Sequence, residues 1–263
     1  MNLSIAVITA GKPYAVQCLA QCRAWADMLG ADLVVAGDKD DGVALAKQYA
    51  DTVVPVDITN GLGESVVPLL AQTCANDWVL RFDDDETGTD ALLNWLLEGA
   101  WVNGNQQVYA FPRAWLWGDE QHFITNTPLW PDVQSRMMKK ELTARWENAV
   151  HAGTPAGTGP VIPVALAHYK FLVRTFAERQ ATARTYDALQ PGAGSGDYYG
   201  RFTLPELFYV NGVTVRELGD GEVMLDEWIN TGEMVPCSRK TGHVTMPIGK
   251  GAWNPSVGNR AAA

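Results

Sequence analysis

The chain contains little cysteine, and its cysteines show none of the spacings of a zinc site. The four cysteines in its 263 residues are Cys18, Cys22, Cys74 and Cys237. Cys18 and Cys22 are one helical turn apart, and we expect both to face the core. Because the sequence lacks a secretory signal, we expect no disulfides and a reducing, cytoplasmic environment.

Long apolar runs are absent as well. No stretch approaches the roughly 20 apolar residues that a membrane-spanning helix needs. The first residues, "MNLSIAVITAGK", lack the basic leader and the cleavage pattern of a signal peptide and are typical of a first strand. We therefore expect a protein with no membrane span.

Basic residues are scarce in the first part of the chain. Residues 1–100 contain 5 Lys and Arg against 15 Asp and Glu, whereas residues 101–263 contain 15 of each. The first part therefore carries the whole net charge of −10. An anionic ligand bound there is repelled unless a cation lies between the ligand and the protein.

Apolar runs and amphipathic segments alternate through the first 105 residues. The β-α-β-α rhythm indicates an α/β fold with a mainly parallel sheet flanked by helices. The predicted strands are "LSIAVIT", "ADLVVAG", "DTVVPV" and "DWVLRF", and the predicted helices cover residues 13–29, 42–50, 61–75 and 89–101.

This rhythm changes after residue 105. "QQVYAFPRAWLW" and residues 134–150 predict strands of a mixed or antiparallel extension, and residues 169–189 predict one long amphipathic helix. The remainder is rich in Gly, Pro and aromatics and predicts a loop-rich C-terminal extension with short helices. The expected organisation is one domain over residues 1–190, with halves 1–105 and 106–190, and an extension over 191–263 packed on it.

Four adjacent acids end the segment "NDWVLRFDDDE", residues 76–86. They repel one another unless water screens them or a cation neutralises them. One explanation is a solvated turn whose acids cap the next helix, and the other is a bound cation. The carboxyl ends of parallel strands meet at one sheet edge, which brings "TAGK", "DKDD" and "DDDE" together there. This convergence favours a ligand site.

The same residues resemble the GT-A nucleotide-sugar glycosyltransferases, and family 2 in particular. "DWVLRFDDDE" is similar to that family's metal-binding Asp-X-Asp strand, "VITAGKP" to its first strand and turn, and "DLVVAGD" to its second strand. "PDVQSRMM", "WENAVH" and "LAHYKF" resemble later elements on the acceptor and metal sides. The resemblance covers residues 3–190 and implies a GT-A, Rossmann-like fold.

The resemblance also implies a donor site with a divalent ion, Mn²⁺ or Mg²⁺. Such an ion, held by carboxylates, stabilises the charge that develops on a nucleoside diphosphate leaving group. Glu86 either joins this site or caps the following helix. The implied metal ligands are Asp83, Asp85 and His168. The implied nucleotide contacts are Thr9, Ala10, Gly11, Lys12, Asp38, Arg81, Asp83 and Asp84.

Enzymes of family 2 invert the sugar's anomeric carbon, so a base must deprotonate the acceptor hydroxyl. The candidates are Asp132, Glu147 and His151, and each has a structural alternative such as capping a turn or pairing with Arg145. The sequence departs from the family pattern at two places. Ala152 replaces the acid of a "VHE" signature, and "GLGES" lacks the basic residue that often contacts a phosphate there.

The sequence therefore predicts a metal-dependent, inverting glycosyltransferase that uses a nucleotide sugar, with a UDP-linked sugar favoured. The alternatives are a nucleotidyltransferase of similar fold and a non-catalytic carbohydrate-binding protein. The acceptor stays open among a saccharide, a lipid-linked glycan, a protein and a modified nucleic-acid base. Eight Lys and Arg residues between Arg136 and Arg184 form either a basic face for an anionic acceptor or an ordinary solvated surface.

Overall fold

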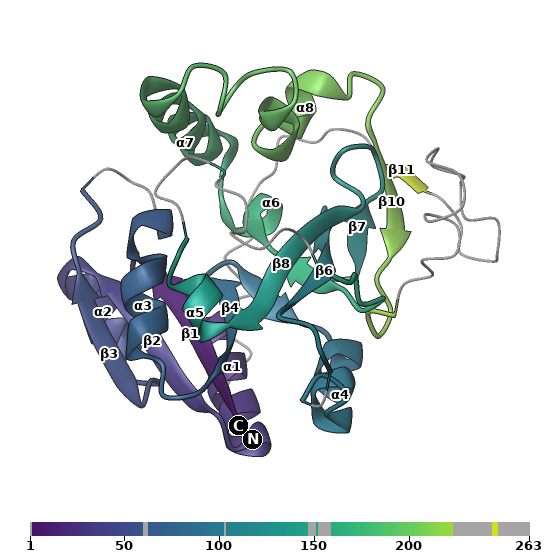
Figure 1. Ribbon diagram of the computed structural model, residues 1–263. Coiled ribbons are helices and arrows are strands. Elements are labelled where there is room, and N and C mark those ends of the chain that lie inside the picture. The colour runs from purple at the N-terminus through teal and green to yellow at the C-terminus, as the bar shows by residue number, and fades with distance from the viewer. Residues whose placement is uncertain are drawn as a thin grey trace, which may run out of the picture.

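An eight-stranded mixed sheet forms the centre of the molecule (Figure 1). The computed structural model describes residues 2–59, 63–102, 104–146, 151 and 159–222, together with the backbone of residues 244–246. The strand order is β3-β2-β1-β4-β8-β6-β9-β5. The predicted α/β fold, with a mainly parallel mixed sheet between helices, is confirmed.

Four parallel strands from the first part of the chain make one half of this sheet. Their continuous apolar sequences suit strands that are covered on both faces. Ile8 lies opposite Asp83, and Thr9 lies opposite Gly37, so the strands end at one edge. These strands are β1 (Leu3–Thr9), β2 (Asp32–Asp38), β3 (Thr52–Val56) and β4 (Trp78–Asp83).

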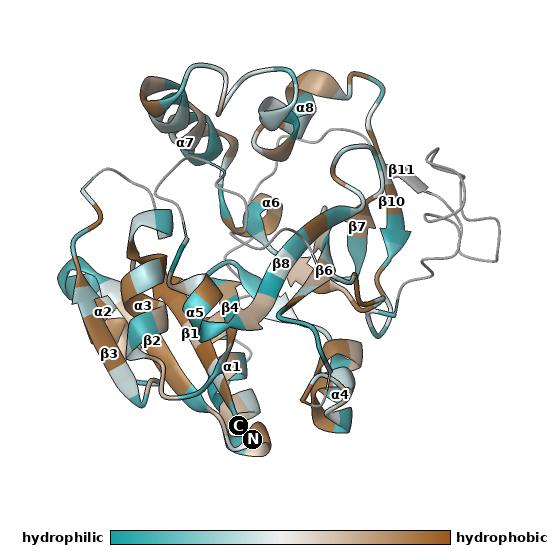
Figure 2. Ribbon diagram, viewed as in Figure 1, coloured by the Kyte–Doolittle hydropathy of each residue, from teal (hydrophilic) through white to brown (hydrophobic). Residues whose placement is uncertain are grey.

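Successive residues of β1 pack on opposite faces of the sheet. Leu3, Ile5 and Val7 join one core cluster with residues of helices α1 and α4, whereas Ala6 joins a second cluster with residues of α3. Figure 2 shows the apolar colouring concentrated along these central strands. Burying each large aliphatic side chain contributes roughly 1.5–3 kcal/mol. The helices are α1 (Ala15–Leu29), α3 (Val67–Thr73, after the short η1, Gly63–Val66) and α4 (Asp90–Glu98).

The second half of the sheet carries later parts of the chain back to the acid run. β8 is antiparallel to both β4 and β6, and β9 pairs with β5 so that His168 lies opposite Glu86. The strands are β5 (Glu86–Gly88), β6 (Val108–Trp115), β8 (Asp132–Lys139) and β9 (Leu166–His168). A smaller sheet holds β7 (His122–Ile124), β10 (Val213–Glu217) and β11 (Val244–Met246).

Two predicted elements are shorter than expected. The strand predicted over 134–150 ends at Lys139, where the short helix α5 (Lys140–Thr143) begins. The single helix predicted over 169–189 is wrong, because it divides into α6 (Lys170–Val173) and α7 (Phe176–Leu189). Thr175 and Glu178 form a reciprocal capping box that starts α7 afresh and leaves Arg174 extended between the helices.

The region after residue 191 contains short elements. η2 (Tyr199–Phe202) and α8 (Pro205–Phe208) precede β10, and residues 223–243 and 247–263 lie outside the described part. α2 (Lys39–Ala46) follows β2 directly and begins earlier than predicted. None of the helices in the described residues is long and apolar enough to cross a membrane.

Candidate functional site

The turn after β1 is joined to the acid run after β4. Thr9 Oγ1 donates a hydrogen bond to Asp84 Oδ2 at 3.0 Å, and the Ala10 backbone N–H donates to the same oxygen at 3.4 Å. Gly11 N–H donates in turn to Thr9 Oγ1 at 3.1 Å. The predicted convergence of these two turns at one sheet edge is therefore present. The role of the turn in nucleotide binding stays a prediction.

Glycines allow α2 to approach this turn closely. Gly11 has φ 71°, and a Cβ there would lie 2.4 Å from the carbonyl carbon of Asp41. A Cβ on Gly42 would lie 2.6 Å from the backbone oxygen of Thr9. The acidic turn after β2 is thus held against the first turn by backbone contact. Asp38 is half-buried at this point, and its Oδ1 accepts a hydrogen bond from Ile58 N–H at 2.8 Å.

Arginines surround the first and last acids of the run. Asp83 Oδ1 accepts from Arg81 at 2.9 Å, and its Oδ2 accepts from Arg136. Glu86 is fully buried, and its Oε1 accepts from both Arg136 and Arg113, the latter at 3.0 Å. Glu86 Oε2 also accepts from Asp83 N–H at 3.0 Å. Neighbouring guanidinium groups therefore neutralise these two carboxylates.

The alternative that the acids cap the next helix is not supported. The N-cap of α4 is Thr89, whose side chain accepts from Leu92 N–H at 3.4 Å, and Glu86 belongs to β5. Burial alone opposes the ionisation of Asp83, but the charges of nearby arginines, Arg136 first, hold the pKa of Asp83 below its usual value. The charges of Asp83 and Glu86 are thus balanced by arginines inside the protein.

Asp85 faces a different set of partners. Its Oδ1 lies 3.0 Å from Nε2 of His168, and its Oδ2 lies 2.9 Å from a terminal nitrogen of Arg174. Burial opposes ionisation of Asp85, but the charges of His168 and Arg174, together with the hydrogen bond to His168, keep its pKa well below its usual value. Burial lowers the pKa of His168, and the charge of Asp85 opposes this shift.

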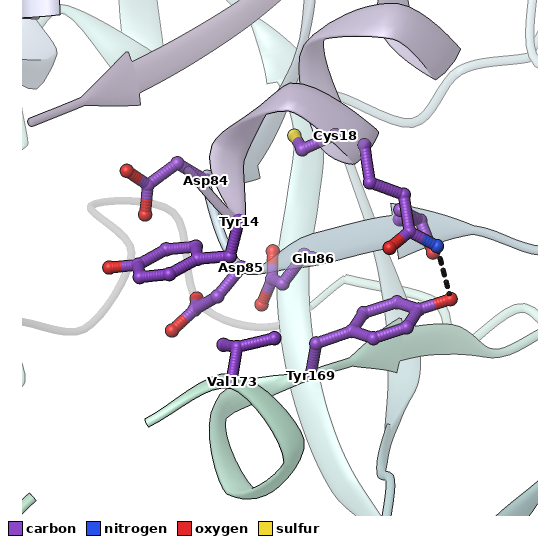
Figure 3. Close-up of a pocket in the computed structure, with 9 residues that line it drawn as sticks. Tyr14, Cys18, Asp84, Asp85, Glu86, Tyr169 and Val173 are labelled. Atoms are coloured by element: carbon purple, nitrogen blue, oxygen red, sulfur yellow. Dashed lines mark hydrogen bonds between the residues drawn. The ribbon is translucent and has the colours of Figure 1, made fainter. Parts of the chain in front are cut away.

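Asp84 and Asp85 both line a small pocket beside the first turn of α1 (Figure 3). The pocket has an empty volume of about 190 Å³, part of which is open solvent. Tyr14 and Tyr169 also line it, and Figure 3 shows the Tyr14 ring beside the two carboxylates. Burial, together with the charge of Asp85, raises the pKa of Asp84 to about 7. Among the three aspartates of the run, Asp84 is thus the one whose pKa is raised.

The three predicted metal ligands are divided by the structure. Asp85 and His168 are together, whereas Asp83 is bound by arginines. Two neighbouring ligands of one Mg²⁺ ion, each about 2.1 Å from it, lie about 3 Å apart, which matches the spacing of Asp85 Oδ1 and His168 Nε2.

No group of three or more His, Cys, Asp or Glu side chains within the described residues is arranged to hold a metal ion. The buried Nδ1 of His168 also lacks a hydrogen-bond partner in that part of the chain, although metal-bound histidines usually have one there. The pair fits a divalent ion only when phosphate and water oxygens supply the other ligands, as is common for Mg²⁺.

The predicted bases have different surroundings. Asp132 accepts from Arg113 at 2.7 Å, from Trp115 Nε1 at 2.9 Å and from Gln134 at 2.7 Å, so it belongs to the arginine network. His151 stacks on Tyr199 with ring centroids 4.1 Å apart, and its Nε2 lies 2.8 Å from the backbone oxygen of Ala193. The third candidate, Glu147, lies outside the described residues.

Sequence reasoning missed several groups at this site. Arg113 was not a candidate, and Arg174 was considered only as part of a basic acceptor face, although Arg113 connects Asp132 with Glu86 and Arg174 binds Asp85. Lys170 was likewise considered only as part of that face. Its Nζ donates a hydrogen bond to the backbone oxygen of Phe202, and burial lowers its pKa to about 7. For Arg113, the signal available was a single basic residue within the otherwise apolar strand β6.

The eight basic residues considered as a face for an anionic acceptor do not form one solvated surface. Arg136 and Arg179 are buried, with 2% and 1% of their surface exposed. Arg179 is bound by Glu206, and Arg174 by Asp85. Internal carboxylates therefore neutralise three of the eight charges.

Comparison with known proteins shows only distant structural likeness. No protein-family model matches the sequence, and no curated protein matches it. The fragment 1–349 of S. aureus TarS is similar with a TM-score of 0.41 and 11% identity, covering 80% of this chain and 74% of that one. CMP:2-keto-3-deoxy-manno-octonic acid synthetase complexed with CTP is similar with a TM-score of 0.42 and 12% identity, covering 63% and 90%. Likeness at this level does not fix a family.

Proposed function

We propose that the chain is a transferase that acts on a nucleotide sugar, with glycosyl transfer from a UDP-linked sugar as the favoured reaction. The observation that carries this proposal is the meeting of the Thr9 turn with the Asp84–Asp85 pair at the carboxyl edge of a parallel sheet. Ligands of open α/β sheets bind at that edge. The His168 side chain, brought there by the β5–β9 pairing, adds a nitrogen ligand.

In this proposal the nucleoside lies against the Thr9 turn and the acidic turn that begins at Asp38. Asp85 and His168 would hold Mn²⁺ or Mg²⁺ together with the donor's diphosphate. When bound, such an ion stabilises negative charge on the leaving diphosphate. The low pKa of Asp85 keeps it ionised and available as a ligand at neutral pH. Asp132, Glu147 and His151 stay the candidates for the base that takes the acceptor's proton.

The proposal is tested by titrating UDP into the protein in a calorimeter, with Mn²⁺ and with chelator. We expect binding with Mn²⁺, weaker binding with chelator, and a loss in Asp85→Asn. His168→Ala should cost less, because water can replace one neutral ligand. Glu98→Gln, at an exposed position of α4, is the matched control.

A parallel assay separates the two kinds of transferase. Release of free sugar from a panel of nucleotide sugars supports glycosyl transfer. Release of pyrophosphate from a nucleoside triphosphate and a sugar phosphate supports the nucleotidyltransferase alternative instead. If UDP and other nucleoside diphosphates fail to bind under all conditions, the proposal is wrong.

A further inference from the structure

A donor diphosphate needs positive charge at a sheet edge where the nearby turns are acidic. Three arginines close to the acid run, Arg81, Arg113 and Arg136, are bound to Asp83, Glu86 or Asp132. Their side chains are only 12%, 13% and 2% exposed. They are therefore poorly placed to meet a ligand.

Arg174 differs from these arginines in position and exposure. It lies in the extended link between α6 and α7, where φ is −114° and ψ is 128°. One terminal nitrogen is 2.9 Å from Asp85 Oδ2, and the guanidinium carbon is 5.3 Å from the centre of the Tyr14 ring. Both Asp85 and Tyr14 line the pocket. Arg174 does not itself line the pocket, but it is bound to Asp85, which does, and its side chain is 26% exposed to solvent.

The guanidinium group of Arg174 also has hydrogen-bonding capacity left. Its Nε is buried and has no hydrogen-bond partner among the described residues. A guanidinium binds phosphate oxygens through two parallel N–H groups, a geometry that a carboxylate shares. An incoming diphosphate can therefore take the place of Asp85 on Arg174. Asp85 then keeps His168 as its partner.

We propose that Arg174 binds the donor's diphosphate and exchanges Asp85 for phosphate oxygens when the donor binds. This inference rests on the proposed function, because it assigns a residue to the phosphate part of the same site. The capping box at Thr175 fixes where α7 begins and hence where Arg174 stands.

The test compares UDP with uridine, because only UDP carries the diphosphate. We would titrate each into wild type, Arg174→Gln, Arg174→Lys and the control Arg184→Gln, which removes a charge from an exposed position of α7. Arg174→Gln should weaken UDP binding roughly 10- to 100-fold, as expected for loss of charge-assisted hydrogen bonds, and leave uridine binding unchanged. Arg174→Lys should be intermediate, and Arg184→Gln should match wild type. Each titration is run with Mn²⁺ and with chelator.

The outcomes separate this inference from the proposed function. If Arg174→Gln weakens the binding of UDP and uridine equally, or weakens the binding of neither, Arg174 is not a phosphate ligand. The nucleotide site itself would still stand. If wild type binds neither UDP nor uridine, the proposed function fails and the inference fails with it. Thermal unfolding checks that each variant folds. If Arg174→Gln does not fold, Arg174→Lys decides: UDP affinity equal to that of wild type would overturn the inference, and a selective loss for UDP would support it.

Discussion

The buried carboxylate of Glu86 offers the sharpest test of how the acid run is stabilised. Replacing Glu86 with Gln keeps the side-chain shape but removes one negative charge between Arg113 and Arg136. The amide also brings an N–H group to the position of Oε2, which accepts from Asp83 N–H. The first change weakens the attraction to the two arginines, and the second leaves the Asp83 N–H without an acceptor, so Glu86→Gln should destabilise the folded state.

The expected loss is large. Removing one partner of a buried ion pair costs roughly 3–5 kcal/mol, and we expect the lower end here because Arg113 keeps Asp132 and Arg136 keeps Asp83. For a chain of this size each kcal/mol lowers the melting temperature by about 2–4 °C, so the shift should be on the order of 10 °C. Glu98→Gln, the exposed control on α4, should change stability by less than about 0.5 kcal/mol.

Urea unfolding followed by fluorescence gives the free energies, and a double-mutant cycle identifies the cause. Arg136→Met should also be costly alone, but it should cost less in the Glu86→Gln background, because the arginine has already lost a partner. A loss below about 1 kcal/mol for Glu86→Gln, or strictly additive losses in the double variant, would refute the claim that the arginines neutralise the run.

Three further predictions concern single carboxylates. The pKa of Asp84 is raised to about 7 in the folded state. Between about pH 4 and pH 7 the folded state therefore keeps a proton on Asp84 that the unfolded state has lost, so the free energy of unfolding falls as the pH rises through this range. The stability of Asp84→Asn relative to wild type, measured by urea unfolding, should therefore rise from pH 5 to pH 8. A difference in unfolding free energy that stays constant over this range would contradict the prediction. Asp38→Asn keeps an acceptor for Ile58 N–H and should weaken UDP binding without lowering the melting temperature; equal affinity would rule out Asp38 as a contact. Asp132→Asn should lower turnover roughly 10²-fold at unchanged donor affinity, whereas normal turnover there, in Glu147→Ala and in His151→Ala would place the base elsewhere.

The sheet was predictable because its strands carry strong local signals. Buried parallel strands are continuous apolar runs, and β1, β2, β3 and β4 all lie where such runs predict them. The division between α6 and α7 was also predictable, since "TFAE" places Thr and Glu at the spacing of a capping box. The helical spacing of apolar residues across residues 169–189 hid this boundary, because it continues through both helices, with Phe171 buried in α6 and Ala183 buried in α7.

The partners of the acids were not predictable from local sequence. Arg113 and Arg136 lie 27 and 53 positions from the acids that they bind, Glu86 and Asp83. They meet these acids only because β8 pairs with β4 and β6 pairs with β8. The sequence predicted a divalent ion among the acids, and that ion stays a prediction. A single sequence does not reveal that arginines on the next two strands of the sheet, β8 and β6, neutralise part of the run.

The run of four acids therefore divides into two pairs with different roles. The pairs are Asp83 with Glu86 and Asp84 with Asp85, so the division does not follow the Asp-X-Asp spacing. Asp83 and Glu86 hold arginines in the sheet, whereas Asp84 and Asp85 join the first turn and the pocket to His168. Asp83→Asn should thus act chiefly on stability, and Asp85→Asn chiefly on ligand binding. Measuring unfolding free energy and UDP affinity for both variants checks this. If Asp83→Asn lost UDP affinity at unchanged stability, the assignment of Asp83 to a structural role would be wrong.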